Sequence, residues 1–272
     1  MPEIKDQTGK WVRLENFPKR IICLVPSITE LLFDLGLRDE VVGITKFCVH
    51  PENWFRTKRR VGGTKNISFD IIRSLSPDLI IANKEENVKE QVLQLEALCP
   101  VYVSNVCNLE EALEMIEQLG KLIGKTASAE LLVCDIRKEF ADLQPIVPGP
   151  KTAYLIWQDP FITVGGDTFI SDMLRKCGFN NVTNTNTRYP AISIKELLDL
   201  KCELLLLSSE PFPFSEKHIP AIRRQLQLHG SQIAEAIQIA LADGEFFSWY
   251  GSRLRLAPKY FRELQNRLIH NR

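Results

Sequence analysis

A segment of 18 residues occurs twice in this chain, in one register and without a gap. The first copy, SFDIIRSLSPDLIIANKE, covers residues 68–85, and the second, SIKELLDLKCELLLLSSE, covers residues 193–210, which is 125 residues later (193 − 68). Each copy has a serine at a helix-capping position, a short amphipathic helix, a polar corner and a four-residue apolar strand. We therefore expect a duplicated supersecondary unit, with one copy in each of two α/β lobes.

The segment RIICLVPSITELLFDLGL, residues 20–37, predicts a strand that turns directly into a helix. Ser27 and Glu30 have the spacing of a capping box, and Gly36 ends the helical pattern. Open α/β sheets bind ligands at the carboxyl ends of their strands, where the free amides of helix N-termini lie. We therefore expect Pro26 and Ser27 to line a ligand site.

The segment FITVGGDTFISDMLRKCGF, residues 161–179, is the expected counterpart in the second lobe. It predicts a strand at 162–164, a turn at Gly165 and Gly166, and a helix capped by Asp167 or Thr168. Two helix N-termini then face each other across a cleft.

The longest helical pattern in the chain lies between the two lobes, at 108–143. If it is continuous, a helix of this length forms a rod of roughly 50 Å, which is enough to join two lobes. We predict an α/β fold with two Rossmann-like lobes joined by one long backbone helix. The predicted ranges are 1–107 for the first lobe, 108–144 for the helix and 145–272 for the second lobe. Such a connection permits only slight opening, which suits the capture of a bulky ligand.

Composition and charge limit the classes of protein to which this chain can belong. Lys plus Arg and Asp plus Glu number 34 each, so the net charge is zero, which argues against a nucleic-acid binder. The seven cysteines form no CxxC pair and predict reduced, buried thiols. The polar N-terminus has no signal-peptide core, which predicts a cytoplasmic protein if the chain is complete.

Three segments resemble the helical-backbone (class III) substrate-binding proteins of ABC importers, nearest to their cobalamin-binding and iron-chelate-binding branch. They are PKRIICLVPSITELLFDLGLRDEVVGIT, VGGTKNISFDIIRSLSPDLIIA and PVYV, and the resemblance extends from about Pro18 to Leu268. It implies a receptor without catalytic activity or an intrinsic cofactor, which holds a cobalamin-like corrinoid, haem or a ferric siderophore between its lobes. It also implies an ABC permease as partner, a monomeric state, and a periplasmic or membrane-anchored extracytoplasmic location.

The resemblance also implies a set of ligand contacts. His50, Thr64 and Asn83 stand where the cobalamin branch has aromatic residues, whereas Phe161 and Tyr189 keep an aromatic side chain. The late segment FFSWYGSRLRLAP, residues 246–258, adds π-faces and guanidinium donors suited to a planar chelate. His50 is also a candidate metal contact. The predicted set is Pro26, Ser27, His50, Thr64, Asn83, Phe161, Tyr189, Trp249, Tyr250, Arg253 and Arg255.

Receptors of this family dock on their permease through one acidic residue on each lobe. The corresponding position in the first lobe is Asp70. In the second lobe it is Lys195, with Glu196 beside it. We expect docking through Asp70 and Glu196.

Two alternatives remain open from the sequence. The first is an enzyme, or a metal or cofactor chaperone, of the chelatase or nucleotide-sugar-transferase type on a similar scaffold. The sequence contains no GxGxxG, P-loop, HExxH or GxSxG motif, and Cys48 with His50 is a weak nucleophile–base pair. The second is a receptor that has lost its ligand and serves as an interaction domain.

Overall fold

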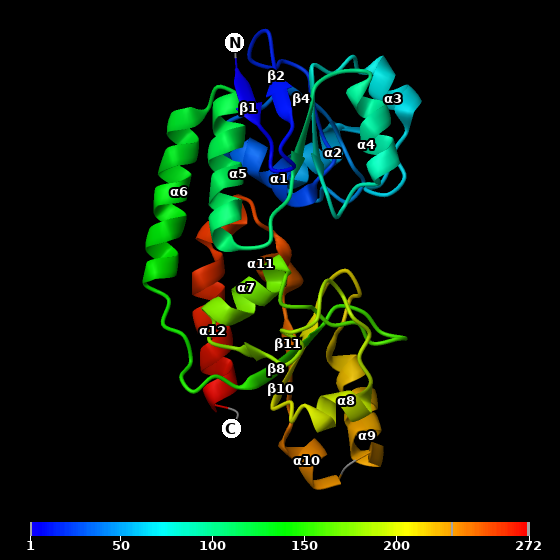
Figure 1. Cartoon of the computed structure of the whole chain (residues 1–272), viewed down its shortest axis with the longest axis vertical. Helices are drawn as coiled ribbons and strands as arrows, with labels where there is room; N and C mark the ends of the chain where they lie inside the picture. The colour runs from blue at the N-terminus through cyan, green and yellow to red at the C-terminus, as the bar shows by residue number, and fades with distance from the viewer. Residues whose placement is uncertain (1, 230, 271–272) are drawn as a thin grey trace. The chain divides into compact units, whose positions relative to one another are not determined.

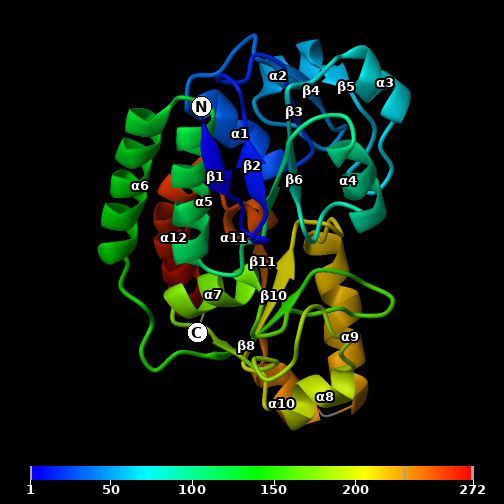
Figure 2. The same ribbon diagram turned by 45° about the horizontal axis from the view of Figure 1, so that its top comes forward.

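The computed structural model describes residues 2–229 and 231–270, which form two compact units (Figure 1, Figure 2). Unit 1 comprises residues 1–106, 110–137 and 249–255, and unit 2 comprises 107–109, 138–248 and 256–272. These units differ from the three consecutive ranges that we expected. The late segment 249–255 belongs to unit 1, although it follows most of unit 2 in the sequence.

Unit 1 is built on a five-stranded parallel sheet with the strand order β5-β4-β3-β6-β7. The strands are β3 (Ile21–Cys23), β4 (Val41–Ile44), β5 (Arg59–Arg60), β6 (Leu79–Asn83) and β7 (Val101–Ser104). The helices that connect them are α1 (Pro26–Asp34), α2 (Glu52–Thr57), α3 (Phe69–Ser74) and α4 (Lys89–Glu96). A separate antiparallel hairpin joins β1 (Glu3–Lys5) to β2 (Trp11–Arg13). The chain moves outward from β3 in one direction and from β6 in the other, so the topological switch point lies between β3 and β6.

The single long backbone helix that we predicted is wrong. Residues 108–143 instead form α5 (Leu109–Leu122) and α6 (Thr126–Ala141), separated by a turn at Gly124 with φ +70°. The two helices lie side by side and antiparallel (Figure 1), and Arg137 pairs with Glu110 at the open end of the hairpin. A Cβ on Gly120 would lie 2.3 Å from the Cβ of Ala129, so the close approach of the helices requires glycine. Gly120 and Gly124 therefore fold the helical pattern back on itself.

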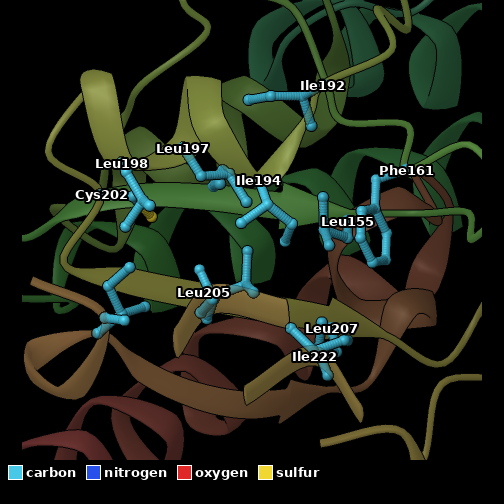
Figure 3. Close-up of a cluster of buried hydrophobic side chains, with 14 of the residues drawn as sticks. Leu155, Phe161, Ile192, Ile194, Leu197, Leu198, Cys202, Leu205, Leu207 and Ile222 are labelled. Atoms are coloured by element: carbon cyan, nitrogen blue, oxygen red, sulfur yellow. The ribbon is translucent and has the colours of Figure 1, made fainter. Parts of the chain in front are cut away.

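Unit 2 has a four-stranded parallel sheet with the order β11-β10-β8-β9. The strands are β8 (Lys151–Leu155), β9 (Asn180–Asn181), β10 (Leu204–Ser208) and β11 (Gln238–Ala242). The helices are α7 (Phe169–Lys176), α8 (Ile194–Asp199), α9 (Ile219–His229), α10 (Ser231–Ala236), α11 (Gly244–Ser248) and α12 (Ala257–His270). One face of this sheet packs on α8 and α9 through Leu155, Leu205, Leu207, Leu197 and Ile222 (Figure 3). Each unit thus has a parallel sheet of its own, which confirms the α/β class.

The duplicated segment adopts one backbone structure in both units. Helices α3 and α8 begin and end 125 residues apart, as do strands β6 and β10. Even the corner is repeated, since Ser76 and Lys201 both have a positive φ, of 44° and 54°. The duplication predicted from the sequence is therefore confirmed at the level of single residues.

The predicted strand at 162–164 is wrong, because Ile162 makes only isolated bridges to Trp157 and Ala191. The helix expected after it is present as α7. Thr168 caps that helix, with its hydroxyl accepting from the Ser171 amide at 3.2 Å. Across residues 2–229 and 231–270, none of the helices is long and apolar enough to cross a membrane.

Candidate functional site

The candidate site lies in unit 1, at the carboxyl ends of β3 and β6, where the strand order changes direction. Helix α1 follows β3 and begins at Pro26, with Val25 as the N-cap residue and no side-chain capping bond. The capping box that we predicted for Ser27 and Glu30 is therefore wrong. Because the helix starts two residues earlier than predicted, Ser27 lies inside it and is buried, and Glu30 is available for another partner.

That partner comes from the late segment 249–255, which packs against α1. A Cβ on Gly251 would lie 2.4 Å from the Ser27 carbonyl oxygen, so only glycine permits this approach. Arg253 donates from Nε and Nη2 to the two carboxylate oxygens of Glu30, at 3.0 and 2.7 Å. The two side chains are only 13% and 18% exposed, so this bidentate pair is shielded from water on most sides. It fixes the late segment on the first helix.

The Trp249 ring contacts two other predicted residues, Arg253 and His50. The guanidinium carbon of Arg253 lies 4.8 Å from the centre of the Trp249 ring, in a cation–π arrangement. The His50 ring contacts the same indole edge-on, with the centroids 5.4 Å apart. His50, Trp249 and Arg253 are distant in the sequence, and the structure brings them together as one aromatic and cationic cluster.

The predicted residues Asn83 and Thr64 belong to a hydrogen-bond network at the end of β6. The Asn83 carboxamide oxygen accepts from the Glu85 and Glu86 amides at 2.8 and 2.9 Å. Asn87 connects this turn to Thr64, because its side chain accepts from the Asn83 amide and donates to the Thr64 carbonyl. Asn83 therefore shapes the turn after β6, whereas Thr64 contributes a backbone oxygen to it.

The network continues through Glu86 to Tyr250 in the late segment. The Tyr250 hydroxyl lies 2.9 Å from a carboxylate oxygen of Glu86 and donates to it. Burial raises the pKa of Tyr250 well above its ordinary value, and the negative charge of Glu86 raises it further. The phenol therefore stays protonated. Burial also raises the pKa of Glu30, against the opposing hydrogen bonds and charge of Arg253.

The neighbouring thiols are unsuited to nucleophilic chemistry. Cys48 is fully buried, and its sulfur accepts a hydrogen bond from the Thr29 hydroxyl at 3.1 Å. Burial raises the pKa of Cys48 and of Cys23, so both are neutral thiols at physiological pH. All seven cysteines are free. Four of them are buried as predicted, whereas Cys99 and Cys107 are half-buried and Cys134 is exposed. Among residues 2–229 and 231–270, no His, Cys, Asp and Glu side chains are grouped as metal ligands.

The other predicted ligand contacts do not belong to the cluster of His50, Trp249 and Arg253 or to the network around Asn83. Pro26 is half-buried at the start of α1, and Arg255 is exposed on unit 1. Phe161 and Tyr189 belong to unit 2, where Phe161 is part of the core drawn in Figure 3 and Tyr189 is 41% exposed.

The predicted docking residues are all on the surface. Asp70, on α3, has a 97% exposed side chain and pairs with Arg73. Lys195 and Glu196 are exposed at the start of α8. Glu196 forms a capping box with Ser193, and these hydrogen bonds lower the pKa of the Glu196 carboxyl.

Sequence reasoning missed Glu30, Glu86 and Asn87 as members of the site. Glu30 was assigned to a helix cap because Ser-x-x-Glu spacing is the usual signal for one. The signal available for Glu86 and Asn87 was their position directly after β6, at the edge of the sheet where ligands bind.

Comparison with known proteins agrees with this architecture. Residues 21–229 match the sequence profile of the periplasmic binding protein family. The vitamin B12-binding protein of Vibrio parahaemolyticus is 28% identical over 195 residues, which cover 70% of each chain. An uncharacterised ABC transporter substrate-binding lipoprotein of Bacillus subtilis, YvrC, is 26% identical over 214 residues, which cover 75% of this chain and 68% of the relative.

A solved structure gives the same result for the fold. The periplasmic haem-binding protein BhuT, in complex with two haems, superposes with a TM-score of 0.79 at 19% identity, over 92% of this chain and 98% of BhuT. The fold is thus that of a two-lobed α/β binding protein. By its sequence, the chain belongs to the periplasmic binding protein family.

Proposed function

We propose that this protein is the substrate-binding protein of an ABC importer and that it captures a corrinoid or another metal chelate, such as haem or a ferric siderophore. The observation that carries the proposal is the cluster of Trp249, His50 and Arg253 at the switch point of unit 1. His50 is the half-buried member of this cluster, whereas Trp249 is only 6% exposed, so the imidazole can contact the rim of a large planar chelate while the indole and the guanidinium hold it in place. A relative by sequence is named for vitamin B12 binding and a neighbour by fold is named for haem binding, which supports this ligand class.

We further propose that the protein binds its ligand without chemical change. The buried, neutral Cys48 thiol supports this proposal, because a nucleophile must be accessible and at least partly ionised. The proposed affinity comes from shape, aromatic contact and the polar groups at the ends of β3 and β6.

The test is direct binding. Cyanocobalamin, cobinamide, haemin and ferric siderophores are titrated into the protein and followed by native mass spectrometry and calorimetry. We expect a one-to-one complex with at least one of these compounds. Trp249→Ala should weaken that complex roughly tenfold or more, because it removes the indole against which the His50 ring and the Arg253 guanidinium pack. Trp11→Ala, at an exposed indole on the β1–β2 hairpin, is the control for a tryptophan outside the site, and urea titration of Trp249→Ala separates lost binding from lost folding, because Trp249 is only 6% exposed.

Two outcomes would contradict the proposal. No binding to any of the four ligand classes would remove the receptor function. Stabilisation by a nucleotide-sugar, which is included in the same titration, would favour the transferase alternative.

We propose an ABC permease as the partner, with Asp70 and Glu196 as the docking residues, and an extracytoplasmic location, which the periplasmic binding protein family supports. The exposure of both carboxylates supports docking, because accessible charges can pair with arginines on a partner. The double variant Asp70→Lys/Glu196→Lys should abolish stimulation of the transporter's ATPase in liposomes and leave ligand affinity unchanged. Unchanged stimulation would place docking elsewhere.

A further inference from the structure

Strand β11 forms one edge of the unit 2 sheet, and the backbone groups of two of its five residues point away from the sheet. The Gln238 amide donates to Glu203 O and the Ala242 carbonyl accepts from Ser209 N, so Gln238, Ala240 and Ala242 face β10. By the alternation of a strand, the amide and carbonyl groups of Ile239 and Leu241 face outward. Within residues 2–229 and 231–270, these four groups have no hydrogen-bond partner.

A groove runs along this edge. It has a volume of about 870 Å³ and is lined by residues 238–241 of β11. Helices α9 and α12 lie on opposite sides of β11 in both views (Figure 1, Figure 2), and they contribute Ile219 and Arg223, and Leu264 and Leu268, to its walls. A slot between two helices with unpaired backbone groups along its floor admits a single extended chain.

The equivalent edge of unit 1 is covered. The duplicated register makes β7 the counterpart of β11, because Ile80 pairs with Val101 and Leu205 pairs with Ile239. The outward amide of Val103 donates to the Asp6 carboxylate at 3.2 Å, and that of Asn105 donates to the Gln7 side chain at 3.0 Å. Both acceptors lie in the turn between β1 and β2. Leu241 stands where Val103 does, and its amide has no such cover.

The groove also carries unpaired charge. Glu216 and Glu235 line it, both are exposed, and neither has an ion-pair partner among the residues that the structure describes. Arg223 is committed to the carbonyl groups of Ala234 and Ile237, at 3.0 and 2.7 Å. Arg267 also lines the groove, so the acidic side chains Glu203, Glu216 and Glu235 face two arginines. The acidic excess favours a partner with basic side chains at Glu216 and Glu235.

We propose that the β11 groove binds an extended segment of a partner protein. The segment lies along β11 and completes the sheet as a fifth strand. It brings an Asp, Asn or Gln side chain to the Leu241 amide, as Asp6 does for Val103, and Lys or Arg side chains to Glu216 and Glu235. This inference is independent of the chelate ligand.

The probe is a synthetic peptide of residues 2–14, PEIKDQTGKWVRL, because it carries both the Asp–Gln pair and three basic residues. It is titrated into the whole isotope-labelled protein, and amide hydrogen exchange is followed by NMR. Without peptide, the Ile239 and Leu241 amides should exchange rapidly, whereas the Ala240 amide, which is bonded to β10, should be protected. Saturating peptide should slow exchange at Ile239 and Leu241 at least tenfold.

Two variants separate docking from folding. Leu241→Pro removes an outward amide without touching the β10–β11 hydrogen bonds, a substitution that edge strands tolerate, and should abolish peptide binding. If that variant does not fold, Glu216→Lys/Glu235→Lys reverses the two surface charges and should weaken the peptide at least tenfold.

Three results would overturn the proposal. One is unchanged exchange at Ile239 and Leu241 at saturating peptide, and another is an effect confined to Val103 and Asn105, where the peptide would only replace the chain's own hairpin. The third is protection of Ile239 and Leu241 that increases with protein concentration alone, together with a doubled mass, which would make the occupant a second copy of this chain.

Discussion

The carboxyl ends of β6 in unit 1 and of β10 in unit 2 have the same backbone structure, but their terminal side chains make different hydrogen bonds. Asn83 ends β6, and its buried carboxamide holds the next turn so that Glu86 reaches Tyr250. Ser208 ends β10 at the equivalent position, and its hydroxyl bonds only the local Glu210 backbone and the Tyr154 phenol. The duplicated segments therefore share a backbone structure, whereas the side chain of the residue that ends each strand determines which hydrogen bonds form there.

The late segment increases this difference. In unit 1, Arg253 makes a bidentate ion pair with Glu30 that attaches residues 249–255 to the sheet edge. In unit 2, the segment after β11 contacts the end of β10 through neutral donors: the Ser248 hydroxyl donates to Glu210 at 2.6 Å and the Gly244 amide donates to the Ser209 hydroxyl at 2.9 Å. In unit 1 the segment is therefore attached by a shielded charge pair, and in unit 2 the equivalent attachment uses neutral donors.

We expect the largest loss of stability when the pair of Arg253 and Glu30 is broken. Arg253→Ala leaves the Glu30 carboxylate shielded and without its cation, and should lower the free energy of unfolding by about 3 kcal/mol. Ser248→Ala should cost only about 1 kcal/mol. Urea titration followed by circular dichroism measures both. The double variant Glu30→Gln/Arg253→Met removes both charges together and should restore most of the loss, and a cost below 1 kcal/mol for Arg253→Ala would refute the contrast.

The next effect compares the two residues that end the strands. Asn83→Ala removes the acceptor of the Glu85 and Glu86 amides and should cost about 2 kcal/mol, because two amides lose their bond at once. Ser208→Ala should cost about 1 kcal/mol. Asn83→Asp, which keeps the accepting oxygen, should be the milder change. Equal costs at the two positions would mean that the turn after β6 is held by other contacts.

A smaller effect compares the caps of the duplicated helices. The Ser193 hydroxyl accepts from the Glu196 amide, whereas Ser68 makes no side-chain capping bond. Ser193→Ala should therefore cost about 1 kcal/mol, and Ser68→Ala should be neutral within ~0.3 kcal/mol. Thermal unfolding of both variants, with Ser193→Asp as the conservative control, gives the answer. A larger loss at Ser68 would reverse the assignment.

The smallest effect is a pair of opposite pH dependences. The pKa of Glu30 is raised above its ordinary 4.5, so its contribution to stability, relative to Glu30→Gln, is present below pH 4.5 and is lost as the pH rises through the raised pKa. The pKa of Glu196 is lowered, so its contribution, relative to Glu196→Gln, is present above pH 4.5 and is lost as the pH falls through the lowered pKa. Urea midpoints of the wild type and the two variants between pH 3 and 7, roughly spanning both transitions, measure the slopes. Slopes of one sign for both residues would contradict the two environments.

The sequence determined the duplicated unit and its register. Local signals were sufficient there, because capping serines, apolar alternation and a polar corner act over a few residues, and two copies specify the same structure. It also predicted that His50, Asn83, Trp249, Tyr250 and Arg253 would share a site, although through the family resemblance rather than through spacing.

Only the tertiary structure decided the partners of those residues. Glu30 had a plausible local role as a capping residue, but a partner more than 200 positions away in the chain, Arg253, has it instead. Gly120 and Gly124 likewise weakened a helical pattern without revealing that it folds into a hairpin. The physical reason is the same in both cases. Helix propensity and capping each contribute only about 1 kcal/mol, and tertiary packing or the loss of a partner in a shielded ion pair changes the free energy by more than that.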